Sequence, residues 1–505
     1  MSLLGIDIGT TGCKATVFAA DGGRLAQAYR EYDIIAPSPG RQELDSLDLW
    51  RKVKEVVAET AAATGRDPIR ALSVSSCGEA MTPVSRDRRI LGPCVLGLDD
   101  RGREYVQEIE AKVGRERLHR LNGNILGHTY SLPILLWQRD HAPALFEAAY
   151  KFLLPADLVF YMLGCDPVTD YALANRTLAF DLRKKAWSDE ILAAVSFPAD
   201  KLPGLAPPGR VIGTVGDRAA SELGLPRGVL AVAGGHDQCC NALGAGVIEP
   251  GAAVYGMGTF GCITPVYREM PDQGLMLANG MNIEDHVVEG LYVSFLYNGS
   301  GGSVLKWFRD SLARLDKEQA AREGADVYAR LLAEMPEEPT DLMVLPHFTT
   351  TGPPLFEHRT SGVVAGLTLR TARGEILKGL LEGITYYFRE GMEYVARAGI
   401  EAGEYRATGG GAKSPAWLQL TADIMGRPIL KPAVTEAGTL GAAILAGAGS
   451  GAFASVAEGV RALVRIERVH EPDMERHAAY NERMERYRRF YPLLREFLAA
   501  MSDRA

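Results

Sequence analysis

The opening of the chain constrains its fold more than any other segment. Residues 3–8 form a short apolar run with Asp7 near its end, and a Gly-Thr-Thr-Gly turn follows at residues 9–12. This pattern predicts a strand, a tight turn and a second strand over residues 13–18. A further turn predicts a third strand over residues 25–35. A nucleotide-binding βαβ domain does not begin with such a meander, and no strand–GxGxxG–helix unit occurs, which excludes a dehydrogenase.

The same pattern begins again in the second half of the chain. After the meander, a helix starting near Asp45 and a buried strand over residues 71–75 complete a β-β-β-α-β order. Strands predicted over residues 252–255 and 262–266 then flank a second glycine-rich turn, residues 256–261. This repetition indicates an internal duplication. We therefore expect an α/β protein with two similar lobes and a cleft between them.

The expected domain boundary lies just before the repeat. We place an N-terminal domain at residues 1–247 and a C-terminal domain at residues 248–505. The segment from about 100 to 200 is rich in charged helical patterns and predicts a helical insertion in the first domain. A charged, arginine-rich helix is expected from Glu471 onward.

Composition narrows the classes of function. The 505 residues carry a net charge of −8, which argues against a nucleic-acid-coating role because phosphate binding needs clustered Lys and Arg. The seven cysteines contain no CxxC pair, which disfavours zinc and iron–sulfur sites and suits reduced thiols. No secretory signal and no membrane-spanning run is visible. We expect a soluble cytoplasmic protein with neither nucleic-acid nor membrane partners.

Two Gly-Thr turns are candidate phosphate sites. In the first, backbone N–H groups and the hydroxyls of Thr10 and Thr11 can approach an anion, with Lys14 close behind, while Asp7 can hold a hydrated Mg²⁺. The alternative is a plain hairpin turn with threonines facing solvent. The second turn contains Gly258-Thr259. Two such turns, each after a buried strand, favour clamping one polyphosphate from both lobes.

A third glycine-rich segment is Thr-Gly-Gly-Gly-Ala-Lys-Ser-Pro at residues 408–415. It is not a Walker A motif, because Ala412 stands where that motif requires glycine. Gly410 and Gly411, between a predicted strand and a predicted helix, fit close backbone approach to a flat base or a phosphate. A tight strand–helix junction without a ligand is the alternative.

Acidic residues at strand ends are the candidates for chemistry on a hydroxyl. Asp237 follows a predicted strand and a Gly-Gly pair, where a carboxylate could take a proton from an attacking hydroxyl. A helix N-cap is the alternative for Asp237. Glu79 and Asp100 also lie at strand or loop ends, where carboxylates commonly bind sugar hydroxyls, although surface ion pairs are commoner. We expect His236 to be a hydrogen-bonding residue, and the adjacent Cys239-Cys240 pair to be helix packing.

Taken together, these segments resemble the FGGY family of carbohydrate kinases, two-lobed members of the actin/Hsp70/hexokinase ATPase superfamily. The resemblance covers nearly the whole chain, and its order and spacing are specific. The segments that carry it include Asp7-Ile8-Gly9-Thr10-Thr11, Pro39 to Asp45, Val168 to Tyr171, Gly235-His236-Asp237-Gln238, Gly258-Thr259, Ser361 to Leu367, and Gly409 to Ser414.

The resemblance implies two ribonuclease-H-like (actin-like ATPase) domains and an ATP-dependent kinase that uses Mg²⁺. Asp237 matches the general base, and Asp7 with Asp237 matches the magnesium-binding acids. The positions matched to the nucleotide are Thr10, Thr11, Lys14, Gly258, Thr259, Gly410, Gly411 and Ala412. The positions matched to substrate hydroxyls are Glu79, Asp100, Asp237 and Gln238.

Departures from the family pattern bear on the substrate. Glycerol kinases carry Arg-Glu where this chain has Gly78-Glu79, and xylulokinases carry Met-His there and Asn at the position of Gln238. Gly78 leaves room, which suits a pentulose, a hexulose or a polyol larger than glycerol. We expect a xylulokinase-like enzyme acting on a ketose such as a pentulose, and the resemblance allows a homodimer. A non-catalytic sugar sensor of the same superfamily is the alternative.

Overall fold

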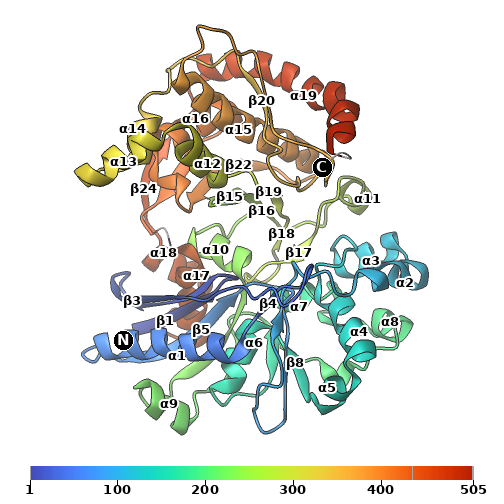
Figure 1. The fold of residues 1–505 in the computed structure, drawn as a ribbon. Helices are drawn as coiled ribbons and strands as arrows, with labels where there is room; N and C mark the ends of the chain where they lie inside the picture. The colour runs from blue at the N-terminus through green and yellow to red at the C-terminus, as the bar shows by residue number, and fades with distance from the viewer. Residues whose placement is uncertain (1, 435, 503–505) are drawn as a thin grey trace. The chain divides into compact units, whose positions relative to one another are not determined.

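The chain packs into two compact units that are each discontinuous in sequence. In the computed structural model, which describes residues 2–434 and 436–502, the first unit comprises Met1–Ile248, Asn282–Val293 and Glu436–Arg465. The second unit comprises Glu249–Met281, Ser294–Thr435 and Ile466–Ala505. Each unit is built on its own β-sheet (Figure 1).

The sheet of the first unit has six strands in the order β13-β14-β5-β1-β2-β3. The first three strands in sequence form the expected antiparallel meander, whereas β5 and β14 run parallel to β1. The third strand ends at Glu31 instead of the expected Ile35, because its partner strand begins at Gly12, which pairs with Glu31. The strands are β1 (Ser2–Ile8), β2 (Gly12–Ala19), β3 (Arg24–Glu31), β5 (Ile69–Ser76), β13 (Val211–Thr214) and β14 (Leu230–His236).

Helices α1 (Ser46–Ala63) and α17 (Ala437–Gly449) cover much of the sheet of the first unit. Helix α1 packs on β2 and β3, and the Asp45 side chain caps it by accepting hydrogen bonds from the backbone N–H groups of its first turn. Helix α17 packs on β1, β5 and β14 and also against α10 (Asp237–Gly244). The apolar side chains between these layers, such as Leu4 and Val74, are wholly buried.

Glycines allow helix α17 to approach its neighbours closely. A Cβ atom added at Gly5 would lie 1.8 Å from the carbonyl oxygen of Thr439, and one at Gly441 would lie 2.0 Å from that of Cys240. No real Cβ atom tolerates such distances, so only glycine fits at these positions. The C-terminal part of the sequence is thereby fixed against strand β1 and helix α10.

The region from about 100 to 200 is mainly helical, as expected, and belongs to the first unit. Its helices are α2 (Arg103–Val113), α3 (Arg115–Asn122), α4 (Ser131–His141), α5 (Pro143–Ala148), α6 (Pro155–Met162), α7 (Tyr171–Asn175) and α8 (Asp189–Ala194). Short strands connect them, among them β8 (Lys151–Leu153), β9 (Val168–Asp170), β10 (Phe180–Asp181) and β11 (Ala186–Trp187). A further antiparallel pair, β17 (Glu284–Asp285) and β18 (Tyr292–Val293), completes the unit from a distant part of the sequence.

The sheet of the second unit repeats this pattern. Strands β15 and β16 form an antiparallel hairpin, and β22 and β23 continue the sheet in parallel on the other side of β15. The repetition agrees with the duplication predicted from the sequence. The strands are β15 (Gly251–Met257), β16 (Gly261–Tyr267), β19 (Leu296–Asn298), β22 (Ala402–Thr408), β23 (Ile429–Pro432) and β24 (Ile466–His470).

Long helices cover the second sheet. The C-terminal helix α19 begins at Met474, three residues after the predicted start, and contacts α15 and α16 (Figure 1). Among the helices of the described residues, none is both long and apolar enough to cross a membrane. The helices are α11 (Gln273–Ala278), α12 (Gly302–Leu312), α13 (Arg314–Glu323), α14 (Val327–Leu332), α15 (Arg373–Arg397), α16 (Pro415–Met425) and α19 (Met474–Ser502).

Candidate active site

The carboxyl ends of three parallel strands gather acidic residues in the first unit. In the sheet register, Asp7 of β1 pairs with Ser75 of β5, and Ser75 pairs with Gly235 of β14. The Ser75 hydroxyl donates a 2.6 Å hydrogen bond to Oδ1 of Asp7. Asp237 follows directly after β14, so its carboxylate comes close enough to act electrostatically on Asp7.

The surroundings of Asp7 favour a bound cation. Burial raises the pKa of the Asp7 carboxyl to about 6, and the negative charge of Asp237 adds to this rise, while the hydrogen bond from Ser75 and the charge of Lys14 oppose it. A Cβ atom at Gly438 would lie 3.1 Å from the Asp7 carboxylate, so this glycine keeps the helix backbone close to the acid. Two neighbouring carboxylates match the oxygen ligands that Mg²⁺ prefers.

Asp237 is the first residue of helix α10 and is held by the residue before it. The N-cap of that helix is His236, not Asp237, so the alternative of Asp237 as the N-cap is wrong. Nε2 of His236 lies 3.2 Å from Oδ1 of Asp237, and Nδ1 lies 2.7 Å from Oε1 of Glu284. The Asp237 side chain is 31% exposed.

His236 is a charged residue at neutral pH. Burial alone would lower the pKa of its imidazole, but the carboxylates of Glu284 and Asp237 outweigh burial and raise the pKa to about 9. Both ring nitrogens therefore carry protons, so that Nδ1–H donates to Glu284, while Nε2 forms an ion pair with Asp237. The imidazolium thus links a buried carboxylate to a partly exposed one.

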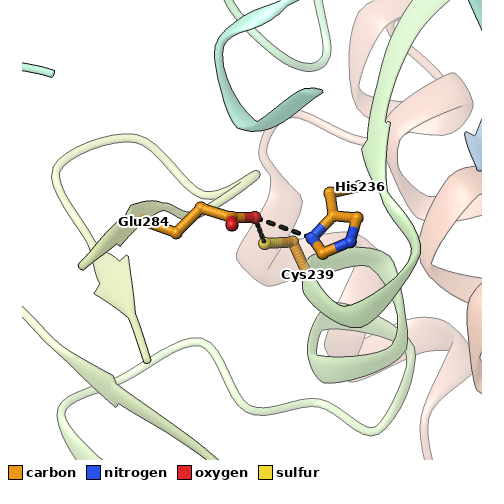
Figure 2. A group of neighbouring side chains, drawn as sticks. All are labelled: His236, Cys239 and Glu284. Atoms are coloured by element: carbon orange, nitrogen blue, oxygen red, sulfur yellow. Dashed lines mark hydrogen bonds and ion pairs between the residues drawn. The ribbon is translucent and has the colours of Figure 1, made fainter. Parts of the chain in front are cut away.

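Figure 2 shows a possible metal-binding group around the same histidine, formed by His236, Cys239 and Glu284. The Cys239 thiol donates to Oε1 of Glu284 at 3.4 Å, and burial raises the pKa of this thiol well above its usual value. A metal would require the thiolate. Hydrogen bonds account for the geometry of all three side chains, and Cys239 contributes to this network as well as to packing.

Glu284 is paired on its other oxygen with an arginine. Nη1 of Arg176 lies 3.1 Å from Oε2 of Glu284, whose side chain is fully buried. The same guanidinium donates through Nε to Oε1 of Glu79 at 2.6 Å, and its Nη2 also donates to that oxygen. Arg176 further donates to Oδ1 of Asn124 at 3.1 Å and lies over the ring of Tyr130. One guanidinium therefore joins two carboxylates.

Glu79 has an uncommon backbone conformation. Its φ is +64°, in the left-handed region that residues other than glycine rarely adopt. The Ser131 hydroxyl donates to the Glu79 carbonyl at 2.6 Å and helps to hold this conformation. Backbone strain of this kind is often kept where a side chain must be aimed at a ligand.

The space beside Gly78 is filled, contrary to expectation. A Cβ atom added at Gly78 would lie 2.8 Å from Cγ of Arg176 and 3.4 Å from Cδ2 of His236. The prediction that Gly78 leaves room for a larger sugar is therefore wrong, because Arg176, the residue directly after helix α7, passes through that space. Sequence reasoning missed both Arg176 and Glu284. The available signal was an arginine directly after the apolar helical segment Tyr171–Asn175.

The other expected substrate residues lie in different surroundings. Gln238 is partly buried in the first turn of helix α10, next to Asp237. Asp100 is exposed and forms a 2.7 Å ion pair with Arg103. Its neighbour Asp99 is buried and binds Arg101 through both carboxylate oxygens. Nothing in these contacts brings Asp100 into the network around Arg176.

The first Gly-Thr turn lies between β1 and β2, as predicted. The Gly9 N–H donates to the Gly12 carbonyl at 2.9 Å and closes the turn. Thr11 is exposed and Thr10 is partly exposed, so both hydroxyls are accessible to a ligand. Lys14 forms an ion pair with Glu436.

In the second unit, a cavity of about 880 Å³ lies beside both glycine-rich segments. Gly258 and Thr259 line it from the β15–β16 turn, and Gly410 and Gly411 line it from the segment after β22. Its volume is within the usual range for small-molecule sites. These four predicted nucleotide positions therefore share one cavity.

Close packing explains why glycines are needed at this cavity. Gly409 has φ +82°, and a Cβ atom there would lie 3.0 Å from the backbone of Met257. A Cβ atom at Gly411 would lie 2.9 Å from Cβ of Met257 and 2.7 Å from the ring of Trp417. The two turns thus pack directly against each other, and a β-carbon on either would separate them.

Other residues of this cavity differ from the prediction. Ala412 is buried beneath the segment and is absent from the lining. Sequence reasoning missed the side chains of Lys306, Asp326 and Tyr328, which do line the cavity. The available signal was the Gly301-Gly302 pair at the start of helix α12, where Gly302 is four residues before Lys306.

Comparison with known proteins places this geometry in a family. The family model for the "FGGY family of carbohydrate kinases, N-terminal domain" matches residues 2–244, and the model for the C-terminal domain of that family matches residues 253–450. Together they span most of the chain. The chain belongs to the FGGY family of carbohydrate kinases.

Individual relatives are similar over their whole length. Xylulose kinase of Bacillus subtilis is 26% identical, covering 99% of this chain and 99% of its own. Autoinducer-2 kinase of Escherichia coli K12 is 27% identical, covering 97% of this chain and 94% of its own. The crystal structure of xylulose kinase from Rhodospirillum rubrum superposes with a TM-score of 0.87 at 27% identity, covering 99% of this chain and all of that one.

These findings confirm the predicted class of protein. The fold is the two-domain, actin-like ATPase fold of FGGY kinases, and the protein is an enzyme that uses ATP to phosphorylate a sugar. The alternative of a non-catalytic sensor is not favoured by the family assignment.

Proposed function

We propose that the substrate is an uncharged ketose, with a pentulose as the first candidate, and that Asp237 is the general base. The observation that carries this proposal is the 3.2 Å ion pair between Nε2 of His236 and Oδ1 of Asp237, which orients the Asp237 carboxylate at the end of β14. Xylulose kinases among the relatives support a pentulose. We assign further hydroxyls of the sugar to Glu79, Gln238 and Asp100.

The mechanism follows from these positions. Oδ2 of Asp237 accepts the proton of the sugar hydroxyl while the hydroxyl oxygen attacks the γ-phosphorus of ATP. The bond between the γ-phosphorus and the bridging oxygen breaks, and ADP leaves. The imidazolium of His236 keeps the carboxylate of Asp237 oriented throughout and is not consumed.

Asp7 and Asp237 are the residues that would hold Mg²⁺. Burial first, and then the charge of Asp237, raise the pKa of Asp7, so a bound cation would stabilise its ionised carboxylate. A bound Mg²⁺ would supply charge neutralisation for the transferring phosphoryl group. Ser75, by donating to Asp7, fixes which carboxylate oxygen remains for the metal.

The nucleotide would bind the cavity of the second unit. Gly258, Thr259, Gly410 and Gly411 offer backbone groups at its wall, and Lys306 adds a positive charge. In the first unit, the phosphate-facing positions that the family resemblance implies are Thr10, Thr11 and Lys14. We accordingly propose that residues 1–247 supply the sugar site and the base, and that residues 248–505 supply the nucleotide site.

Charge counting supports an uncharged sugar. Around Asp237 the carboxylates are those of Asp237, Glu79 and Glu284, whereas the cations are His236 and Arg176. Both cations of this network are already paired with carboxylates, so neither is available to bind the carboxylate of an aldonate. Ketoses and polyols carry no charge and avoid this cost.

Cellular context is part of the proposal. All seven cysteines are free thiols, which supports a cytoplasmic location. A homodimer is proposed on the family resemblance, and light scattering of the purified protein tests it.

The direct test is ADP formation with Mg-ATP against a panel of ketoses, polyols, aldoses and aldonates, with a blank that contains no sugar. One ketose should raise the rate far above the blank, whereas aldonates should not. Asp237→Asn should reduce this rate by about 10²-fold or more while nucleotide affinity is retained. Full activity of the variant would refute the assignment of the base, and a rate independent of sugar would refute the kinase proposal.

A further inference from the structure

Arg176 occupies the centre of the polar network in the first unit. It lies one residue past the end of α7, where its side chain is only 13% exposed, and it contacts carboxylates from two other parts of the chain. Glu79 follows β5 in the sequence, and Glu284 belongs to β17. The network therefore joins three separate elements at one guanidinium.

The guanidinium binds Glu79 asymmetrically. Both Nε and Nη2 donate to Oε1 of Glu79, and Oε2 stays outside this pair. The Glu79 side chain is 18% exposed, so a small molecule can reach it. Because a carboxylate held by one oxygen cannot rotate, its second oxygen has a fixed direction.

We propose that Arg176 is a specificity-determining positioning residue, which fixes Glu79 so that Oε2 accepts a hydrogen bond from one hydroxyl of the sugar. This inference rests on the proposed function and adds the residue that sets substrate selectivity. Arg176 does not touch the reacting atoms. It acts through Glu79, and its second contact, to Glu284, supports the histidine that holds Asp237.

The glycine at position 78 makes space for the Arg176–Glu79 pair. A side chain there would collide with Cγ and Cβ of Arg176, at 2.8 and 3.0 Å from the new Cβ atom. Gly78 has no positive φ that would itself require glycine. Glycine is therefore required at position 78 because the Arg176 side chain passes beside it.

Lysine cannot replace this arginine. It keeps the positive charge between the two carboxylates, but it lacks the planar fork that binds Oε1 of Glu79 through two N–H groups. Arg176→Lys should therefore leave the fold intact and let the Glu79 carboxylate rotate. The variant should lose recognition of one particular hydroxyl rather than activity in general.

The first experiment compares the best ketose with its set of monodeoxy analogues. In the wild-type enzyme, one analogue should have a kcat/KM about 10- to 100-fold below that of the parent sugar, since it lacks the hydroxyl bound by Glu79. Arg176→Lys and Glu79→Gln should both abolish discrimination against that same analogue. The KM for the parent sugar should rise about tenfold in both variants, with the KM for ATP unchanged.

Arg117→Lys is the matched control. Arg117 also binds a carboxylate through Nε and Nη2, that of Glu190, in an exposed part of the same unit. This variant should keep the wild-type ranking of the deoxy sugars. If replacing any paired arginine changed the deoxy-sugar ranking, Arg117→Lys would change it as well. That result would overturn the specific role of Arg176.

The second experiment is a double-mutant cycle between positions 78 and 176. Gly78→Ala in the wild-type background should displace Arg176 and cause the same loss of discrimination. In an Arg176→Gly background the collision is absent, so Gly78→Ala should have no further effect. Equal effects of Gly78→Ala in both backgrounds would overturn the coupling. Thermal unfolding and nucleotide binding by each variant establish that it is folded.

The outcomes separate this inference from the proposed function. If the wild-type enzyme phosphorylates a ketose but Arg176→Lys retains the full deoxy-sugar ranking, the inference about Arg176 is wrong and the kinase assignment stands. If the wild-type enzyme phosphorylates no sugar of the panel, the proposed function fails first, and this inference fails with it.

Discussion

Alternating charges join the residues around Asp237 into one network. Asp237, His236, Glu284, Arg176 and Glu79 follow one another with opposite signs, and the central Glu284 is fully buried. Removing one member of a buried pair leaves an uncompensated charge, so each residue depends on its neighbours. The network therefore gives the two carboxylates at its ends fixed orientations.

The protonation of His236 is the first prediction at this scale. Because its pKa is raised from the usual value of about 6.5 to about 9, the imidazole should titrate at a pH about two units or more above that of an exposed histidine. The associated stability is complete below pH 6.5 and is lost as the pH rises through about 9. NMR titration of ¹⁵N-labelled histidines tests this, and Glu284→Gln should lower the pKa. Titration of His236 near pH 6.5 in the wild type would contradict the charged network.

The charge state of Asp7 gives a second prediction. With its pKa raised to about 6, Asp7 is largely protonated below that pH, and protonation competes with a divalent cation. The Mg²⁺ concentration needed for half-maximal activity should therefore rise as the pH falls from 7 to 5. Asp7→Asn should need far more Mg²⁺ at every pH. If the variant needed no more Mg²⁺ than the wild type, the assignment of Asp7 to the metal site would be wrong.

At the scale of elements, glycine contacts fix helix α17 on the sheet of the first unit. The Gly5 backbone on β1 and the Thr439 carbonyl leave no space for a side chain, and Gly441 makes the same kind of contact with helix α10. Interiors are packed densely enough that an added methyl group must displace backbone. The position of α17, and with it Gly438 beside Asp7, depends on these contacts.

Gly5→Ala should accordingly destabilise the protein by about 3 kcal/mol, in the upper range for overpacking, because its Cβ atom would lie 1.8 Å from a carbonyl oxygen. Gly65→Ala is the control, since a Cβ atom there has no neighbour within 4 Å. Its effect should stay within about 1 kcal/mol. Urea unfolding measures both, and equal effects would refute the packing argument.

Elements that have a local pattern were predicted well from the sequence. The meander, helix α1 and both glycine-rich turns depend on residues close in sequence, so they are visible without a structure. The space beside Gly78 could not be predicted in this way, because Arg176 reaches it from a part of the chain 98 residues away. Likewise Glu284 meets His236 across 48 residues, and no local periodicity signals such a pairing.

At the scale of the whole molecule, the proposed ligands belong to different units. The cavity of about 880 Å³ lies within the second unit, whereas the network around Asp237 lies within the first. A ligand that binds one unit should protect the backbone amides of that unit from hydrogen exchange. The assignment of ligands to units is therefore open to direct measurement.

We expect a non-hydrolysable ATP analogue to slow hydrogen exchange most at residues 257–260, 302–306 and 409–411. The ketose alone should instead slow exchange at residues 76–79 and 236–238. Hydrogen–deuterium exchange with mass spectrometry resolves these segments, and the Asp237→Asn variant, which should bind both ligands without turnover, serves as the control. Protection of the first set by the sugar alone would contradict the assignment.

The discontinuity of the first unit also limits how the gene can be divided. A fragment ending at residue 247 would lack Glu284, the buried carboxylate that pairs with His236, and would lack helix α17, which covers strands β1, β5 and β14. Such a fragment would expose an apolar face and would lack the contact between His236 and Glu284. Functional chimaeras with related kinases will therefore require the segments 282–293 and 436–465 to come from the same parent as the N-terminal half.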